Sequence, residues 1–250
     1  MNTGDVWIYT AHTDNGVGTG LSVDEQRIAG AINHPRQRMQ YMAGRRLLRT
    51  ALSLHHWRET GEYRPETDWW LLRQNGRTVT DRTQTRWQVS LSHSGSCIGC
   101  LLSTSPHCGI DLEAHSRSAP TLAIARRYFH GDEYEALVGL DEPERQALFL
   151  SLWTRKEATI KACHVGIAGY LPRIVFDPAT LAPISLPEEF GDLSLQFGTW
   201  TLGDWLMSGA VASTIPLRWH HSGNLLREPG RQDHFQLLTP ERLAEYSIHP

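Results

Sequence analysis

The spacing of apolar and polar residues predicts short strands and helices in alternation along the chain. Residues 6–10, 69–73, 87–91 and 98–102 are short runs with the β-branched and aromatic content of strands. Ser22 and Glu25 form a capping-box pattern that opens a short helix. A longer helix is predicted over residues 35–57, where apolar side chains recur at helical spacing.

The second half repeats this plan loosely. It predicts a strand at 108–113, helices at 120–129 and 143–164, and strands at 174–176, 193–197 and 209–213. We therefore expect an α+β fold of two similar lobes in a pseudo-twofold arrangement, each a helix packed on a small, mainly antiparallel sheet. Pro106 interrupts an apolar run and marks the boundary. The expected division is 1–105, 106–218 and a polar tail at 219–250 with a short helix near 240–246.

Composition narrows the class of protein. The 250 residues are 40% hydrophobic and 20% charged, which is ordinary for a globular chain that buries its own core. A net charge of −3 argues against a nucleic-acid-binding surface. Four cysteines make no disulfide framework, the N-terminus lacks a signal-peptide layout, and no apolar run reaches the roughly 20 residues of a membrane span. We expect a cytoplasmic protein without membrane or nucleic-acid partners.

Two carboxylates stand close together in the segment GIDLE at 109–113. Side chains on a strand alternate between faces, so Asp111 and Glu113 point to one side, and Ile110 and Leu112 to the other. Such a pair is either a solvated acidic face or a magnesium site, since Mg²⁺ binds one or two carboxylates together with phosphate oxygens.

A second constellation lies in the segment WTRKEATIK at 153–161. On a helix, Trp153, Glu157 and Lys161 share one stripe. The pair Glu157 and Lys161 is commonly just an exposed ion pair. Its position beside a tryptophan instead favours the wall of a cleft, where Glu157 adds a third carboxylate and Lys161 meets a phosphate or protonates a leaving group.

Ser92 and His93, in LSHSG at 91–95, are adjacent on a predicted strand and therefore face opposite ways. That arrangement is poor for a nucleophile and its base, and the chain has no G-x-S-x-G elbow. We interpret His93 as a possible hydrogen-bond donor to a phosphate.

Arginines cluster in the first half of the chain. Arg38, Arg45 and Arg49 share one face of the predicted 35–57 helix, and Arg73 and Arg77 flank an Asn-Gly turn. The set is either a solvated basic face or a cradle for phosphate groups, which guanidinium binds in a bidentate manner.

The segments LSHSG, GIDLE and W-x-x-K-E-A-x-x-K, in this order, resemble the 4′-phosphopantetheinyl transferase family, specifically its two-lobed Sfp type. The helix segment GRRLLR at 44–49 is also similar to that family's first-lobe helix. The resemblance covers residues 40–180 or so. One departure is Gly76-Arg77-Thr78, where relatives often carry Gly-Lys-Pro.

The resemblance implies Mg²⁺-dependent, or Mn²⁺-dependent, transfer of 4′-phosphopantetheine from coenzyme A to a serine of an acyl or peptidyl carrier protein, releasing 3′,5′-ADP. Asp111, Glu157 and Lys161 would be catalytic, with Glu157 taking the serine proton and Lys161 protonating the leaving group. Asp111, Glu113 and Glu157 would bind the metal, and Glu133 aligns with an acidic residue near it in some relatives. The residues implied to bind coenzyme A are Arg45, Arg73, Arg77, Ser92, His93, Lys156 and Lys161.

The family plan implies an active site between the lobes and a monomeric enzyme. Carrier proteins of this kind are acidic, so a local basic patch should meet them. The candidates are Arg36, Arg38, Arg45 and Arg46.

Other interpretations stay open. A non-catalytic relative would bind coenzyme A or a carrier protein, and a Mg²⁺-dependent hydrolase of nucleotide diphosphates would use the same carboxylates. Cys97 and Cys100, with His107 and Cys108 nearby, suggest zinc, but the first two face opposite ways on a strand and no second C-x-x-C follows. The histidine pairs 55–56 and 220–221 are interpreted as surface residues.

Overall fold

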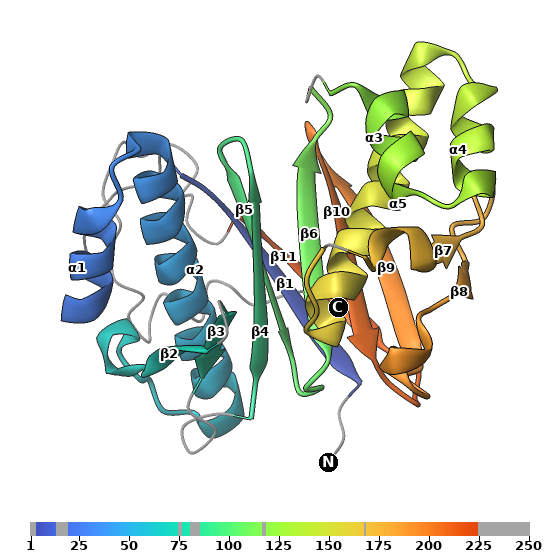
Figure 1. Ribbon diagram of the computed structural model, residues 1–250. Coiled ribbons are helices and arrows are strands. Elements are labelled where there is room, and N and C mark those ends of the chain that lie inside the picture. Colours follow the sequence, from blue (N-terminus) through green and yellow to red (C-terminus); the bar gives the residue numbers. More distant parts are fainter. Residues whose placement is uncertain are drawn as a thin grey trace. The chain divides into compact units, whose positions relative to one another are not determined.

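The computed structural model describes residues 4–13, 20–74, 77–80, 86–116, 119–167 and 169–224, with only the backbone of 72–74, 77–79 and 222–224. These residues form two compact units (Figure 1). The N-terminal unit holds residues 6–104 and 219–224, and the C-terminal unit holds residues 4–5 and 105–218.

A four-stranded sheet and one long helix form the N-terminal unit. The strand order is β11 (Arg218–Asn224), β1 (Asp5–His12), β5 (Cys97–Ser103) and β4 (Gln88–Ser94). β1 and β4 both pair antiparallel with β5. Helix α2 (Pro35–Thr60) packs on β4 and β5, where Leu47, Leu48 and Ala51 meet Tyr9 and Ile98 in the core. The apolar residues Leu47, Leu48 and Ala51, which helped to predict the helix at 35–57, therefore lie on the face of α2 that covers the sheet.

The remaining elements of this unit are small. Helix α1 (Val23–Ala31) begins at Ser22, whose hydroxyl accepts from the Glu25 amide while the Glu25 carboxylate accepts from the Ser22 amide, so the predicted capping box is confirmed. Helix α2 ends at Gly61, which takes the left-handed conformation at φ 74°. The 3-10 helix η1 (Glu66–Asp68) leads to the β2–β3 hairpin (Leu71–Gln74 and Arg77–Thr80).

The C-terminal unit places one long helix on a three-stranded antiparallel sheet. The strand order is β6 (Cys108–Ala114), β10 (Trp205–Ala212) and β9 (Leu195–Leu202). Helix α5 (Glu142–Cys163) packs on β6 and β10. The smaller elements are α3 (Thr121–Tyr128), α4 (Gly131–Val138), η2 (Leu171–Arg173), β7 (Val175–Phe176), β8 (Pro183–Ser185) and η3 (Glu188–Phe190).

The α+β class and the small antiparallel sheets agree with the sequence prediction. Helix α4 was not predicted, because it spans only eight residues and begins at a glycine. Residues 219–224, expected to open a loose polar tail, continue β11 and pair in the sheet. The predicted helix at 240–246 lies outside the described residues, and the pseudo-twofold relation and the three-part division remain predictions. Among the residues described, no helix is long and apolar enough to cross a membrane.

His55 lies inside the N-terminal unit, so its interpretation as a surface residue was wrong. Its Nε2 atom forms a hydrogen bond with the hydroxyl of Tyr9, and its ring lies 4.9 Å from that of Trp7 and 4.6 Å from that of Trp87. Burial, together with nearby cationic groups led by Arg58, holds the pKa of His55 well below 6.5. His55 is therefore neutral in the folded protein near neutral pH.

We predict that the free energy of unfolding falls as the pH drops below about 6.5. In that range His55 binds a proton in the unfolded chain but stays neutral in the folded chain. One such proton changes stability by about 1.4 kcal/mol per pH unit. Urea unfolding at several pH values between 5 and 7.5 measures this slope. The H55Q variant should show a smaller slope, not zero, because burial also lowers the pKa of His221. H56Q, at the half-buried neighbouring position, should keep the wild-type slope, and an equal slope in H55Q and wild type would refute the prediction.

Candidate functional site

Strand β6 sorts its side chains between two faces, as the sequence predicted. Ile110 and Leu112 are completely covered on one face. Gly109, Asp111 and Glu113 alternate onto the other face. Asp111 is only 6% exposed, whereas Glu113, nearer the end of the strand, is half-buried. A solvated acidic face therefore does not describe this strand, since one of its two carboxylates is buried.

Helix α5 lies against this face at the closest approach that a backbone allows. A Cβ atom built on Gly109 would lie 2.0 Å from the Ala158 carbonyl oxygen and 2.6 Å from the Ala162 nitrogen. Only a residue without a side chain fits there. Gly109, the glycine of GIDLE, therefore lets the backbone of α5 lie directly on β6, two positions before Asp111 on the same strand.

The close approach joins the segments GIDLE and WTRKEATIK through an ion pair. The Lys161 Nζ atom lies 2.8 Å from Asp111 Oδ1 and also donates to the Ile110 carbonyl at 2.9 Å. The Lys161 side chain remains 29% exposed, so its ammonium is reachable from solvent. Glu157, one turn earlier on α5, is only 8% exposed. The Asp111 carboxylate and the Lys161 ammonium therefore meet where β6 and α5 pack together, and the buried Glu157 lies one helical turn before Lys161.

The aromatic end of the stripe on α5 belongs to the core. The Trp153 ring stacks on those of Phe149 and Phe129 at centroid distances of 5.9 and 6.4 Å. The tryptophan therefore anchors the helix within its own unit. The idea that it forms the wall of a cleft remains a prediction.

The donor atoms at this site suit a hard cation but do not complete its coordination. Within the part of the chain that the structure describes, no three His, Cys, Asp or Glu side chains are grouped closely enough to hold a metal ion. Carboxylate oxygens are nevertheless the ligands that Mg²⁺ prefers, and Mg²⁺ commonly takes only one or two of them and completes its shell with water and substrate phosphates. Asp111 and Glu157 fit that pattern, and Glu113 lies on the same face of β6.

Lys156 and Glu133 lie in the interior of the C-terminal unit. Both side chains are completely buried, and the Lys156 Nζ atom lies 2.7 Å from Glu133 Oε2. The ammonium also donates to the carbonyls of Leu171, at 3.0 Å, and Ile174. The predicted contact of Lys156 with coenzyme A and the position of Glu133 near a metal stay predictions, and the structure describes both residues as an interior ion pair. Each buried charge is neutralised by the other.

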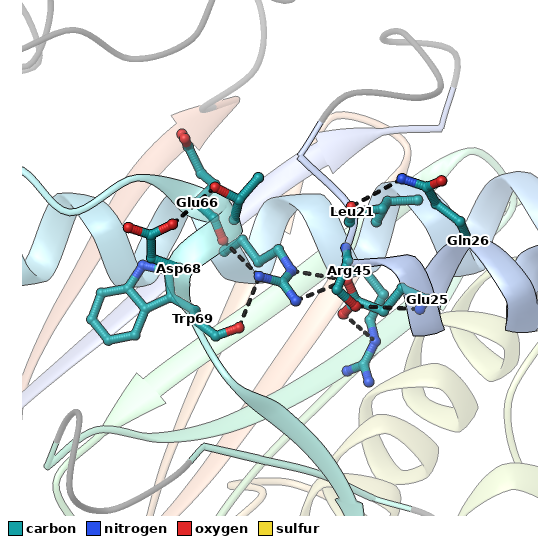
Figure 2. Close-up of polar contacts among 10 residues, drawn as sticks. Leu21, Glu25, Gln26, Arg45, Glu66, Asp68 and Trp69 are labelled. Carbon is teal, nitrogen blue, oxygen red and sulfur yellow. Dashed lines mark hydrogen bonds and ion pairs between the residues drawn. The ribbon is translucent and has the colours of Figure 1, made fainter.

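Two of the three clustered arginines in the N-terminal unit are interior residues as well. Figure 2 shows Glu25, which lies on α1, and the contacts that arginines of α2 make with it. Arg45 Nε lies 3.3 Å from Glu25 Oε1, and Arg49 Nη2 lies 2.9 Å from Oε2. Arg49 is 1% exposed and also donates to the carbonyls of Glu66 and Trp69 at 2.6 and 2.9 Å.

Arg49 thus ties α2 to α1 and to the segment around η1, and it is neither part of a solvated face nor of a phosphate cradle. Arg45 is buried beside it, and its contact with coenzyme A stays a prediction. Arg38 is exposed and donates to the Ile32 carbonyl. The capping box accounted for Glu25 locally, and for that reason its second role as the partner of two arginines could not be foreseen.

The other predicted ligands of coenzyme A lie on the strands of the N-terminal unit. On β4, Ser92 is buried and His93 is exposed, as expected for neighbours on a strand. Arg73 and Arg77 oppose residues Thr78 and Gln74 in the β2–β3 hairpin, and their side chains lie outside the described part of the structure.

The cysteines are thiols. Cys97, Cys100 and Cys108 are buried, and burial raises the pKa of the Cys97 thiol to about 11. A buried thiol with a raised pKa is a weak metal ligand, because the thiolate is the binding form.

Comparison with known proteins gives a family that one segment of the chain resembles. Residues 107–208 match the family model described as the 4'-phosphopantetheinyl transferase superfamily, a stretch that contains Asp111, Glu113, Glu157 and Lys161. This segment is therefore similar to the 4′-phosphopantetheinyl transferase superfamily.

Curated members of the superfamily match longer parts of the chain. The 4'-phosphopantetheinyl transferase HetI of Nostoc is 32% identical over 59% of this chain and 61% of its own length. The 4'-phosphopantetheinyl transferase psf-1 of Bacillus pumilus is 30% identical over 68% of this chain and 65% of its own length. The 4'-phosphopantetheinyl transferase Sfp of Bacillus subtilis is 38% identical over 32% of this chain and 34% of its own length. The chain thus spans less than two thirds of each of these relatives.

Sequence reasoning missed several residues that shape the candidate site. Gly109 carries no chemistry of its own and was noted only as part of a motif. Thr154 and Ser208 are completely buried and hydrogen-bonded to each other at 2.8 Å. The pairing of β10 with β6 sets Ser208 opposite Asp111. No local sequence pattern predicts the contact between Thr154 and Ser208, because the two residues are 54 positions apart.

Proposed function

We propose that this protein transfers the 4′-phosphopantetheine group of coenzyme A to a serine of an apo acyl or peptidyl carrier protein and releases 3′,5′-ADP. The observation that carries the proposal is the Asp111–Lys161 ion pair beside Glu157, within the segment that matches the superfamily. Three relatives are 4'-phosphopantetheinyl transferases, which supports transfer of this group.

A divalent metal, Mg²⁺ or Mn²⁺, would be held by Asp111 and Glu157, with Glu113 as a further ligand or the holder of a water. The fit rests on the donor atoms, which are carboxylate oxygens on one strand face and the helix above it. When bound, the metal supplies positive charge that neutralises the pyrophosphate of coenzyme A.

The protein's own side chains carry the proton transfers. Glu157 takes the proton of the carrier serine, whose oxygen forms a bond to the phosphorus that bears the pantetheine arm. The bond from that phosphorus to the bridging oxygen breaks, and its electron pair leaves with 3′,5′-ADP. Lys161 contacts the neighbouring phosphate and gives the leaving group a proton. Asp111 holds that ammonium in place at 2.8 Å beforehand.

In the N-terminal unit, Arg73, Arg77, Ser92 and His93 are proposed to bind the phosphates of coenzyme A. Exposed His93 suits this role best among the described side chains. Arg45, Lys156 and Ser92 are buried, and a contact of Arg45 or Lys156 with coenzyme A stays a prediction. Arg36 and Arg38 are exposed on the first turn of α2 and offer positive charge to an acidic carrier protein. A cytoplasmic location and a monomeric state remain predictions.

Intact mass of an apo acyl carrier protein, after incubation with this enzyme, coenzyme A and Mg²⁺, tests the proposal. We expect a gain of one phosphopantetheine group, lost on addition of a chelator and in the D111A variant. No gain with fatty acid, polyketide or peptide-synthesis carriers, while coenzyme A still binds, would instead indicate a non-catalytic relative. Release of free phosphopantetheine would indicate a hydrolase.

A further inference from the structure

The buried ion pair of Lys156 and Glu133 lies on the side of α5 that faces away from the sheet. At 100° per residue, Lys156 projects about 200° from Thr154 around the helix axis. Thr154, Ala158, Lys161 and Ala162 are the residues that meet β6 and β10. The ion pair therefore acts on α5 from behind the face that carries the candidate site.

Both members of the pair bind several partners at once. The three donors of the Lys156 ammonium are matched by three acceptors, which are Glu133 Oε2 and the carbonyls of Leu171 and Ile174. Glu133 in turn accepts from the Phe176 amide at 2.9 Å and from the His130 amide at 3.0 Å. The pair thus connects α5 to the start of α4, to η2 and to β7.

A chain of hydroxyl groups holds the opposite side of α5. Thr154 donates to the Leu150 carbonyl at 2.9 Å, so Ser208 on β10 donates to Thr154 at 2.8 Å. Thr199 on β9 lies 3.2 Å from the Ser208 hydroxyl. These directional contacts fix the helix against the sheet at the turn before Glu157.

We infer that Lys156 and Glu133 are positioning residues, which set the rotation of α5 and so aim Glu157 and Lys161 at the reacting groups. A small rotation of the helix would draw the ammonium away from its three acceptors and leave a buried charge unpaired, an arrangement that proteins avoid. Because the Thr154–Ser208 contact opposes the pair across the helix, α5 is held from both sides. The inference rests on the proposed function, because it assigns these residues an effect on that reaction.

The experiment distinguishes an effect on the position of α5 from an effect on the stability of the protein. A buried ion pair can be replaced by neutral residues of similar volume without loss of stability. In the double variant E133Q/K156M, we expect kcat for carrier-protein modification to fall about 10- to 100-fold, since a misplacement of about 1 Å has effects of this size. The KM for coenzyme A should change by less than about threefold, because a loss confined to the transition state lowers kcat alone.

L137A is the matched control, since Leu137 is a completely buried core residue of the same unit with no polar part in the network. It should lose stability yet keep kcat within about twofold at a temperature where circular dichroism shows every protein folded. If the double variant does not fold, T154V tests the restraint on α5 from the side of the sheet. This substitution removes the Thr154 hydroxyl and changes the side-chain volume little. We expect kcat to fall severalfold.

Three results would overturn the inference. The first is a folded double variant, or a folded T154V in its place, with the kcat of the wild type. The second is a loss of kcat in L137A equal to that of the double variant, which would make the effect one of general destabilisation. The third is a wild-type enzyme that transfers nothing, which refutes the proposed function itself and is seen before any variant is compared.

Discussion

The E157Q variant is expected to lower kcat for carrier-protein modification by about 10²- to 10⁴-fold, the usual contribution of a general base. Glutamine has nearly the same shape as glutamate but cannot take the serine proton, and it is a poorer ligand for a hard cation. Glu157 is buried one helical turn before Lys161, so solvent water is a poor substitute for its carboxylate. Initial rates of carrier-protein modification, followed by intact mass, measure the change.

E144Q is the matched control for this substitution. Glu144 lies on the same helix, in its exposed first turn, and the chemical change is identical. Its kcat should equal that of the wild type. If E157Q kept a rate within severalfold of E144Q, Glu157 would not be the base, and a carboxylate on β6 would have to take its place.

The G109A variant is expected to destabilise the C-terminal unit by about 3 kcal/mol, at the upper end of the usual cost of overpacking. The added methyl group would lie 2.0 Å from a backbone oxygen of α5, and a backbone cannot yield as a flexible side chain does. The helix must therefore move away from β6. The distance from Lys161 to Asp111 grows with that movement, so the remaining folded enzyme should also lose about 100-fold in rate.

G139A, also in the C-terminal unit, provides the comparison. A Cβ atom on Gly139 would meet its nearest neighbour, the Ala136 carbonyl oxygen, at 3.8 Å, an ordinary contact. Urea unfolding should give G139A nearly wild-type stability and full activity. A G109A protein as stable and as active as G139A would show that α5 does not need to rest on β6.

The local geometry of the site could be read from the sequence, because it depends on short-range periodicity. Alternation on a strand separates Asp111 from Ile110 and Leu112, and the 3.6-residue turn of a helix brings Glu157 and Lys161 to one stripe. The capping box at Ser22 is equally local, and it is present in the structure. Each of these patterns needs only residues within a few positions of one another.

The interior charges could not be read in this way. Arg49 and Lys156 stand in polar-looking stretches of helix, and the sequence pattern is typical of solvated faces. Their partners Glu25 and Glu133 lie 24 and 23 positions away, on other helices. Burial of His55 has the same origin, because Tyr9 approaches it from β1 and Trp87 from the residue before β4. Whether a charged or titratable group is inside depends on what covers it, and that information is not local.

The sequence by itself therefore determined the α+β class, the order of the main elements, the family resemblance and the residues whose chemistry suits phosphoryl transfer. Only the tertiary structure decided which helix face meets which strand face, that Gly109 allows α5 to lie on β6, and that Lys161 reaches Asp111 across 50 positions of chain. It also showed that Arg45, Lys156 and Glu133 are buried. The physical reason is that periodicity orients a side chain relative to its own element, whereas its partners are chosen by the packing of elements far apart in the chain.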